Sequence, residues 1–479
     1  MSIGARPHAA RALRAIDPSG RFPRLLGADL EVPCVDGRPR RYVNLDYAAS
    51  TPVMEDVWAA VEAFVPWYSS VHRGSGVKSQ VSTTAFEDSR AAVAAFVGAR
   101  ADDQVVFVRN TTEAINVLAA AMPAGTRVLS SPVEHHANML PWRRHDVRLL
   151  PFTGSADELL AACARALRAE RFDLLAVTGA SNVTGEIWPV AELGALAHRH
   201  GAELFVDAAQ LAPHRAIDMA AAGIDHLALS GHKLYAPFGA GALVAGPARL
   251  AAGPPLLRGG GAVKLVTLDE VIWEGAPERH EAGSPDVVGV VALAAACRRL
   301  DELGMATVAD HERTLAARLC DGLRGIGGLR TLRLWPDDTA DRVGVATFTL
   351  AGYRHPLLAA ILSAEHAIGV RHGCFCAHPL IAQLLGLDDA EIARLVDELR
   401  AGRRPALPGA VRASVGLGTT AGDVELLLDA LDEIAVSGPR QRYEYEPALD
   451  EYRPRAYAAG ARWSSSSRVT SSPRSIAAM

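Results

Sequence analysis

The chain of 479 residues lacks the features that mark several classes of protein. No stretch approaches the roughly 18 uncharged apolar residues of a membrane-spanning helix. A formal net charge of −5 gives no electrostatic reason to expect nucleic acid or an anionic membrane as a partner. Cysteine is sparse, and its six positions (34, 163, 297, 320, 374 and 376) are scattered, which favours a reducing compartment over a disulfide framework. We therefore expect a cytoplasmic protein.

What the chain has is the length and periodicity of a two-domain α/β protein. Its length exceeds what one hydrophobic core usually supports. From about residue 104 to 245, short apolar strands alternate with Ala- and Leu-rich helical stretches, which predicts βαβ units and a mostly parallel sheet with both faces covered. From about residue 300, a long helix (305–324), a few strands and a closing helix (423–435) predict a smaller α+β domain.

The predicted boundaries follow these changes of pattern. Residues 41–300 are expected to form the large domain, and residues 301–438 the small C-terminal domain. Residues 1–40 are expected to pack on the small domain or to be partly disordered, although their Arg-rich, acid-free opening would also fit a transit peptide. Residues 439–479 become poor in aliphatic side chains and rich in Ser and Arg, so we predict a disordered tail.

Polar side chains follow two of the predicted strands, at the end of a parallel sheet where ligands collect. Lys233 lies just past one strand, in a Gly-rich turn with Ser230 and His232, and could form a Schiff base with a carbonyl cofactor. Asp207 ends another strand and is followed by Gln210. A carboxylate in that place can keep a pyridinium nitrogen protonated. A solvated lysine and a helix-capping Asp are the ordinary alternatives.

A third segment, "RNTTEAIN", places Asn110, Thr111 and Thr112 at the start of a helix that follows a strand. Free amides and hydroxyls at a helix N-terminus bind phosphate. A capping box with Glu113 explains the same residues equally well. Taken together, the phosphate-binding helix start, the strand-end Asp and the strand-end Lys follow one another in the order that a pyridoxal-phosphate enzyme requires.

The chain resembles the class V aminotransferase-fold enzymes, and most closely the SUF-type (group II) cysteine desulfurases. The matching stretches run in order from about residue 42 to 435 and include "RNTTEAIN", "VEHHANMLPW", "VDAAQ", "LSGHKLYAP", "RHEAGSPD" and "VRHGCFCAHP". The resemblance implies the pyridoxal-phosphate-dependent transferase fold (fold type I), pyridoxal 5'-phosphate as cofactor, and a homodimer. It also implies conversion of L-cysteine to L-alanine, with the sulfur held as an enzyme persulfide and passed to an acceptor protein or small molecule.

The resemblance also implies which residues bind the cofactor. Lys233 would form the Schiff base and move the α-proton, and Asp207 would pair with the pyridine nitrogen. His135 would stack on the ring as a further catalytic residue. The remaining contacts to the ring, its substituents and its phosphate would come from Thr111, Thr112, Asn182, Gln210, Ser230 and His232.

Two further sets of residues would complete the site. Arg371 and Arg412 would hold the α-carboxylate of the substrate beside Asn182, because a guanidinium fork suits a planar anion. Ser284 and the triple glycine at 259–261 would reach the active site of the second protomer.

Two cysteines, Cys374 and Cys376, lie one residue apart in "RHGCFCAHP". Only Cys376 falls in the register of the family's nucleophile, so the resemblance implies that Cys376 carries the persulfide. In an extended segment side chains 374 and 376 would share a face, so a secondary role for Cys374, such as accepting sulfur from Cys376, stays open. No metal is expected, because C-x-C with His372 and His378 is not the usual ligand spacing of zinc.

The chain departs from the SUF-type pattern after this motif. A helical insert, "LDDAEIARLVDELRAG", precedes Arg412, and the G-C-F-C stretch is similar to the desulfurase domain of molybdenum cofactor sulfurases. The same fold also hosts transaminases, epimerases and C–S lyases, in which both cysteines would be idle. Alanine formed in equal amount with sulfide from cysteine would identify a desulfurase, and a keto acid product would identify the others.

Overall fold

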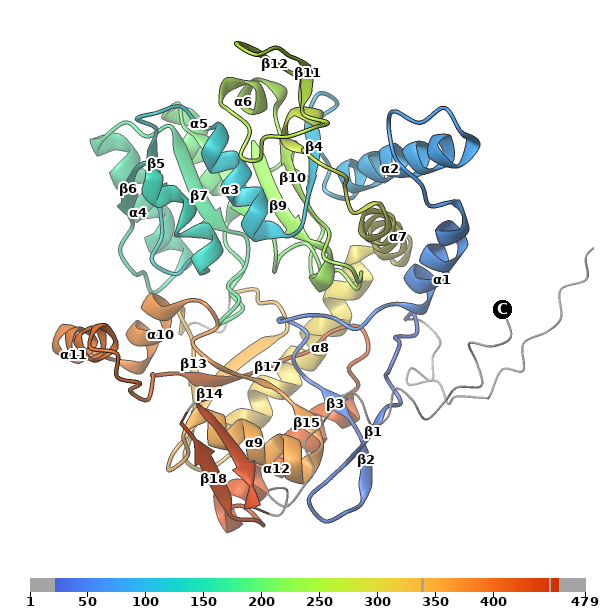
Figure 1. Cartoon of the computed structure of the whole chain (residues 1–479). Coiled ribbons are helices and arrows are strands. Elements are labelled where there is room, and N and C mark those ends of the chain that lie inside the picture. The colour runs from blue at the N-terminus through green and yellow to red at the C-terminus, as the bar shows by residue number, and fades with distance from the viewer. Residues whose placement is uncertain (1–21, 337–339, 448, 456–479) are drawn as a thin grey trace, which may run out of the picture.

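The computed structural model describes residues 22–336, 340–447 and 449–455, and Figure 1 shows two domains, each built on its own sheet. The strands of the large domain are β4 (Gln104–Val108), β5 (Arg127–Ser130), β6 (Asp146–Leu149), β7 (Leu174–Thr178), β8 (Glu203–Asp207), β9 (His226–Ser230) and β10 (Gly241–Ala245). They lie in the order β4–β10–β9–β8–β7–β5–β6. Neighbouring strands from β9 to β6 are parallel, whereas β10 is antiparallel to both β4 and β9. The predicted mostly parallel sheet is confirmed.

Helices cover both faces of this sheet. Side chains alternate between the faces along each strand, so in β9 Leu227 and Leu229 pack in one hydrophobic cluster and Ala228 packs in another. The helices α3 (Thr111–Ala121) and α6 (Pro247–Ala252) cover the Ala228 face. The opposite face packs against α4 (Ala156–Ala169), α5 (Val190–Arg199) and α7 (Val287–Leu303), with α1 (Glu55–Phe64) and α2 (Val77–Phe96) against α7.

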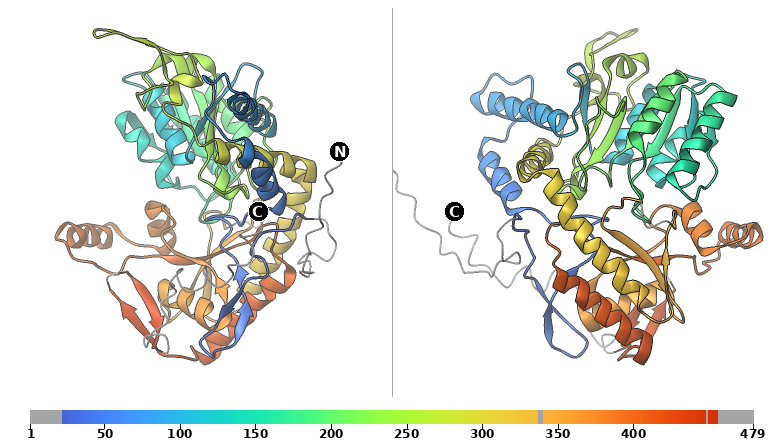
Figure 2. Two further views of the ribbon diagram at one scale, coloured as in Figure 1. Left: turned by 45° about the vertical axis from the view of Figure 1, so that its right-hand side comes forward. Right: turned by 180° about the vertical axis from the view of Figure 1, so that it is seen from behind.

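The small domain contains a four-stranded antiparallel sheet in the order β13 (Leu329–Leu332), β14 (Val345–Leu350), β17 (Ala410–Ser414), β16 (Arg371–Gly373). Its hydrophobic core lies between this sheet and the helices α8 (Met305–Arg324), α9 (His355–His366) and α12 (Ala421–Ser437). The back view in Figure 2 shows α8 running from the large domain along α12. The predicted insert forms α11 (Asp389–Arg400), which follows α10 (His378–Leu385) and has no buried residue.

Residues 31–44 lie with the small domain, and the chain then crosses to the large one. After a hairpin of β1 (Glu31–Pro33) and β2 (Pro39–Arg41), β3 (Val43–Asn44) pairs in parallel with β15 (Ile368–Gly369). The Ala48 carbonyl then accepts a hydrogen bond of 2.7 Å from Gln210 Nε2 in the large domain. Residues 42–51 are therefore a link between the two domains. The first 21 residues of the predicted N-terminal segment lie outside the described residues.

The predicted disorder after residue 439 is wrong for the part of the tail that the structure describes. Here β18 (Tyr443–Glu446) and β19 (Glu451–Pro454) form an antiparallel hairpin. The rings of Tyr445 and Tyr452 lie 5.0 Å apart, and the Arg354 guanidinium lies 4.9 Å from the Tyr445 ring. Aromatic and cation–π contacts thus supply packing that aliphatic side chains do not provide. The rest of the predicted tail, 456–479, lies outside the described residues.

The remaining elements are short. A hairpin of β11 (Val263–Val266) and β12 (Val271–Trp273) projects from the edge of the large domain (Figure 1). The 3-10 helices are η1 (Val65–Trp67), η2 (His136–Asn138), η3 (Pro141–Arg144), η4 (Gly231–Lys233) and η5 (Glu278–His280). Among the described helices, none combines the length and the apolar character that a membrane crossing requires.

Candidate active site

A cavity of about 330 Å³ lies between the two domains, at the carboxyl ends of β7, β8 and β9. Asp207 and Ser230 are the last residues of β8 and β9, and Lys233 follows in η4. The small domain closes the cavity with residues of β16, β17 and the segment after β16. All predicted site residues except Ser284 line it: Thr111, Thr112, His135, Asn182, Asp207, Gln210, Ser230, His232, Lys233, Arg371, Cys376 and Arg412.

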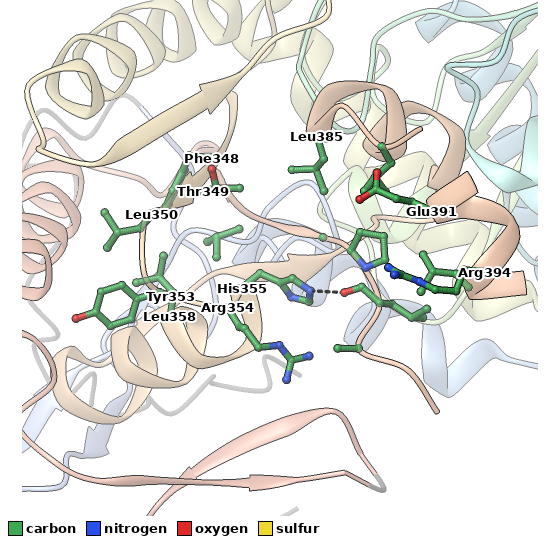
Figure 3. Close-up of a pocket in the computed structure, with 17 residues that line it drawn as sticks. Phe348, Thr349, Leu350, Tyr353, Arg354, His355, Leu358, Leu385, Glu391 and Arg394 are labelled. Atoms are coloured by element: carbon green, nitrogen blue, oxygen red, sulfur yellow. Dashed lines mark hydrogen bonds between the residues drawn. The ribbon is translucent and has the colours of Figure 1, made fainter. Parts of the chain in front are cut away.

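A separate cavity of about 350 Å³ lies within the small domain, and Figure 3 shows it between β14, α9 and the region of α11. Its walls are mostly apolar, and His355 Nε2 lies 3.2 Å from the Leu407 carbonyl oxygen there. None of the predicted site residues lines it. Although it is slightly larger, its lining residues include neither a lysine nor a cysteine, both of which face the interdomain cavity.

Burial shifts the pKa values of three side chains in the interdomain cavity. Burial lowers the pKa of Lys233 to about 8, an effect that the nearby Asp207 carboxylate only partly offsets. Burial also lowers the pKa of His135 to about 4, so its ring is neutral at pH 7. Burial raises the pKa of Asp207, whose Oδ1 accepts the Ala209 N–H at 3.0 Å. An amine poised to lose its proton therefore shares the cavity with a carboxylate and a flat neutral ring.

The start of α3 has an N-cap but not the capping box that was the alternative for "RNTTEAIN", because the Glu113 carboxylate accepts the N–H of Arg109 at 2.7 Å. The Asn110 side chain caps the helix by accepting the Glu113 N–H at 3.0 Å. The hydroxyls of Thr111 and Ser230, however, are buried and find no partner in the described part of the chain. Buried polar atoms without a partner are uncommon in native proteins. A phosphate at this helix start would satisfy both hydroxyls, so the residues present fit the predicted cofactor.

Gln210 gives a second observation of the same kind. Its Nε2 is bonded to the Ala48 carbonyl, but its buried Oε1 has no partner within the described residues. An acceptor left free beside Asp207 and Lys233 fits a ligand with polar ring substituents. Pyridoxal 5'-phosphate has both the phosphate and the ring substituents that these orphaned atoms require.

At the small-domain side, one carboxylate lies between two guanidinium groups. Asp46 Oδ2 lies 3.1 Å from Arg371 Nη2, and Asp46 Oδ1 lies 3.4 Å from Arg412 Nη2. Arg412 also donates from Nη1 to the Asn182 carbonyl at 2.8 Å. Burial lowers the pKa of Arg412 to about 10, so the group stays charged at neutral pH. Two cations and one anion leave a positive charge that suits the carboxylate of an amino acid.

The two cysteines do not share a surface. Cys376 is exposed and lines the cavity, whereas Cys374 is partly buried against the main hydrophobic core. The alternation expected from an extended segment is wrong, because Phe375 and Cys376 adopt left-handed backbone conformations with φ of 53° and 55°. Among residues 22–455, as far as the structure describes them, no three His, Cys, Asp or Glu side chains gather as metal ligands.

Ser284 lies apart from the cavity of its own chain. It is exposed, and the adjacent Gly283 donates its N–H to the Gly260 carbonyl at 2.8 Å. The Ser284 segment and the triple glycine at 259–261 therefore lie side by side on the surface of the large domain. Their predicted contribution to a second protomer stays a prediction.

Sequence reasoning missed two acidic residues of the site. Asp46 approaches the arginines through the pairing of β3 with β15 and a bridge to Ser414, contacts that no local sequence pattern indicates. Glu134 is buried, and this burial raises its pKa to about 8. It accepts the Thr178 N–H at 3.1 Å and the Asn138 amide at 2.7 Å, which fixes the segment that carries His135. Glu134 precedes the predicted ring-stacking His135 in the sequence, and this position could have indicated its role.

Comparisons with known proteins agree with this geometry. A family model described as aminotransferase class-V matches residues 43–427. A cysteine desulfurase of Klebsiella pneumoniae (strain 342) is 35% identical over 413 residues, which cover 84% of this chain and 94% of that protein. A cysteine desulfurase of Cronobacter sakazakii is 37% identical over 363 residues, which cover 72% of this chain and 86% of the relative.

Solved structures give the same result. The apo structure of a cysteine desulfurase from Thermococcus onnurineus NA1 superposes with a TM-score of 0.72 at 31% identity, covering 82% of this chain and 94% of that one. The structure of the cysteine desulfurase CsdA from Escherichia coli, described with an S-sulfonic acid, gives a TM-score of 0.68 at 32% identity with the same coverage. Both similarities extend over the two domains that form the cavity.

Proposed function

The chain belongs to the class V aminotransferase family, and on that premise we propose that it is a pyridoxal-phosphate-dependent cysteine desulfurase. It converts L-cysteine to L-alanine and retains the sulfur on Cys376. One observation carries the proposal: an amine of lowered pKa, two arginines and an exposed cysteine face one cavity. A transaminase or an epimerase has no use for that thiol.

Pyridoxal 5'-phosphate is the cofactor of this family. When bound, it draws electrons away from the α-carbon of an amino acid. Lys233 would hold its carbonyl carbon and Asp207 its pyridine nitrogen, while the neutral ring of His135 would cover one face. Its phosphate and remaining ring substituents would lie against Thr111, Thr112, Ser230, His232 and Gln210.

Residues of the chain bind the substrate, transfer its α-proton and accept its sulfur. Arg371 and Arg412 orient the substrate through its α-carboxylate. With a pKa of about 8, Lys233 is neutral in about one molecule in ten at pH 7, so it can take the α-proton. The Cys376 thiolate then attacks the substrate sulfur. The carbon–sulfur bond breaks as a sulfur–sulfur bond forms. Protonation of the β-carbon and return of a proton from Lys233 to the α-carbon then yield alanine and an enzyme persulfide.

The test of this function is the product formed from L-cysteine. We expect alanine and, with dithiothreitol present to reduce the persulfide, sulfide in equal amounts. Pyruvate with sulfide would instead identify a C–S lyase, and a keto acid dependent on an added amino-group acceptor would identify a transaminase. Either result would replace the desulfurase proposal.

The substrate arginines give a prediction about affinity. Arg412→Lys is expected to raise the KM for L-cysteine about 10- to 100-fold, because a lysine cannot reproduce the hydrogen bonds of a guanidinium to a carboxylate. Arg394→Lys, at the separate small-domain cavity, should leave KM unchanged. Steady-state alanine release measures both variants. An unchanged KM for Arg412→Lys would remove Arg412 from the substrate site.

We also propose that the enzyme is a cytoplasmic homodimer that passes its sulfur to an acceptor protein or small molecule. The described cysteines are all free thiols, which suits a reducing compartment. The β11–β12 hairpin exposes a group of large apolar side chains near the triple glycine: Leu265, Val266, Leu268, Val271 and Ile272. Such a group is a common mark of an interface.

The dimer is predicted to be the active form, with Ser284 of one protomer reaching the cofactor phosphate of its partner. Sedimentation at micromolar concentration should therefore give twice the mass of the chain. Leu265→Asp combined with Ile272→Asp should shift the protein towards monomer and lower its cofactor content. A wild-type monomer with full activity would contradict the prediction.

A further inference from the structure

The segment that carries Cys376 has an unusual backbone. Gly373, Phe375 and Cys376 have φ values of 112°, 53° and 55°. Glycine tolerates positive φ, but a non-glycine residue in the left-handed region is destabilised because its Cβ approaches the following carbonyl oxygen. Phe375 and Cys376 adopt this conformation one after the other, so the surrounding structure must hold them in place.

Two residues from the large domain hold the carbonyl groups of this segment. Asn182 donates from Nδ2 to the Phe375 carbonyl at 2.7 Å. The backbone N–H of His136 donates to the Cys376 carbonyl, also at 2.7 Å. The Phe375 ring is buried, with the Arg412 guanidinium 5.0 Å from its centre. The carbonyl next to the sulfur-bearing side chain is thus fixed by residue 136.

His136 contacts the same segment a second time, through its ring. Its Nε2 lies 3.3 Å from the His378 backbone nitrogen and 3.2 Å from His378 Nδ1. The two rings stack with centroids 4.9 Å apart. His378 is the first residue of α10, and the first N–H groups of a helix have no partner within it. To accept that N–H, Nε2 must carry no proton, so the contact requires neutral His136.

We propose that His136 is the positioning residue of the sulfur-carrying segment, because its main chain holds Cys376 while its ring holds the start of α10. Cys376 is then fixed from both sides at the mouth of the cavity. His136 is not among the residues that line the cavity, so it acts through Cys376. The proposal rests on the proposed desulfurase function and deepens it.

The contact between the His136 ring and the His378 N–H is expected to weaken as the pH falls. The groups that face His136 are His378 on α10, Arg143 on η3 and the neighbouring His135. Burial, together with His378 and Arg143, lowers the pKa of His136 below its ordinary value of 6.5. Release of the segment would return the pKa towards 6.5. The held form is therefore favoured above pH 6.5, and the preference is lost as the pH falls from there towards the lowered pKa.

Two substitutions separate positioning from packing. His136→Ala removes the acceptor, whereas His136→Gln keeps an oxygen that can accept the His378 N–H and cannot titrate. His200→Gln, at the end of α5, is the matched control. Each protein is compared for kcat and KM of alanine release between pH 5.5 and 8, and for amide hydrogen exchange of the peptide that contains residues 371–380.

At pH 7.5, His136→Ala should lower kcat about 3- to 10-fold, the effect of losing one hydrogen bond, with KM and cofactor content unchanged. His136→Gln should restore most of kcat and should decline less steeply than the wild type below pH 6.5, since only the titration of Lys233 remains. Exchange at residues 375–378 should rise in His136→Ala and stay near wild type in His136→Gln.

Equal impairment of both variants, or wild-type exchange in His136→Ala, would overturn the proposal. The exchange measurement does not depend on turnover. If the wild type releases no alanine, the desulfurase function fails, and exchange still decides whether His136 holds the segment.

Discussion

Lys233→Ala is expected to lower alanine release from L-cysteine by at least about 10³-fold, because one substitution removes both the covalent attachment of the cofactor and the base that takes the α-proton. The wild-type protein should be yellow when purified, and the variant should lose that absorbance band. Lys233 is suited to both tasks, since burial already lowers its pKa to about 8. Absorbance spectra and alanine quantification, with circular dichroism to verify folding, make the measurement.

The low number of lysines makes the attachment site of the cofactor easy to identify. There are only three lysines, Lys78, Lys233 and Lys264. Borohydride reduction followed by peptide mapping should place the cofactor on Lys233. Lys78→Ala, on the exposed side of α2, is the matched control and should keep both colour and activity. A cofactor tag on Lys78 or Lys264 would show that the assignment is wrong.

Cys376→Ser is expected to abolish alanine release while leaving the cofactor band in place. The serine hydroxyl cannot accept sulfur from the substrate, whereas the lysine, the carboxylate and the arginines of the cavity are untouched. Cys374→Ser should retain most of the activity, because Cys374 packs against the core rather than lining the cavity. The two substitutions lie two positions apart and each replaces one sulfur atom with oxygen, so each variant serves as the control for the other.

The reverse outcome would identify Cys374 as the nucleophile. The segment would then have to change its conformation during catalysis so that Cys374 faces the cavity. A third outcome is informative as well. If Cys374→Ser forms alanine in a single turnover but releases sulfide slowly, Cys374 accepts sulfur from Cys376. Mass spectrometry of the persulfide after one turnover distinguishes these cases.

The parts of the site that follow from local pattern were predictable. Asp207 and Lys233 stand at the ends of short apolar strands bounded by turn residues, so their placement at one sheet edge followed from the alternation of strands and helices. The same holds for Thr111 at the start of α3. The antiparallel β10 was not predictable in this way, because reversal of a buried strand leaves its apolar pattern unchanged.

Contacts between segments that are distant in the sequence could not be predicted from local sequence patterns. Asp46 meets Arg371 and Arg412 because β3 pairs with β15 and Asp46 bridges to Ser414, both more than 300 positions further along the chain. The inequivalence of Cys374 and Cys376 depends on two left-handed residues that tertiary contacts impose. The β18–β19 hairpin was mistaken for disorder because composition counts aliphatic residues and overlooks stacked tyrosines.

The pairing of β3 with β15 has a consequence for biosynthesis. Residues 43–46 leave the ribosome more than 300 residues before their partners at 368–371 and 412–414. The large-domain sheet can form from contiguous chain, whereas contacts of such long sequence separation form late. A nascent chain that ends before residue 410 can therefore assemble the cofactor side of the cavity but lacks Arg412. The pocket for the amino-acid carboxylate is completed only after residue 412 has been synthesised and has reached Asp46.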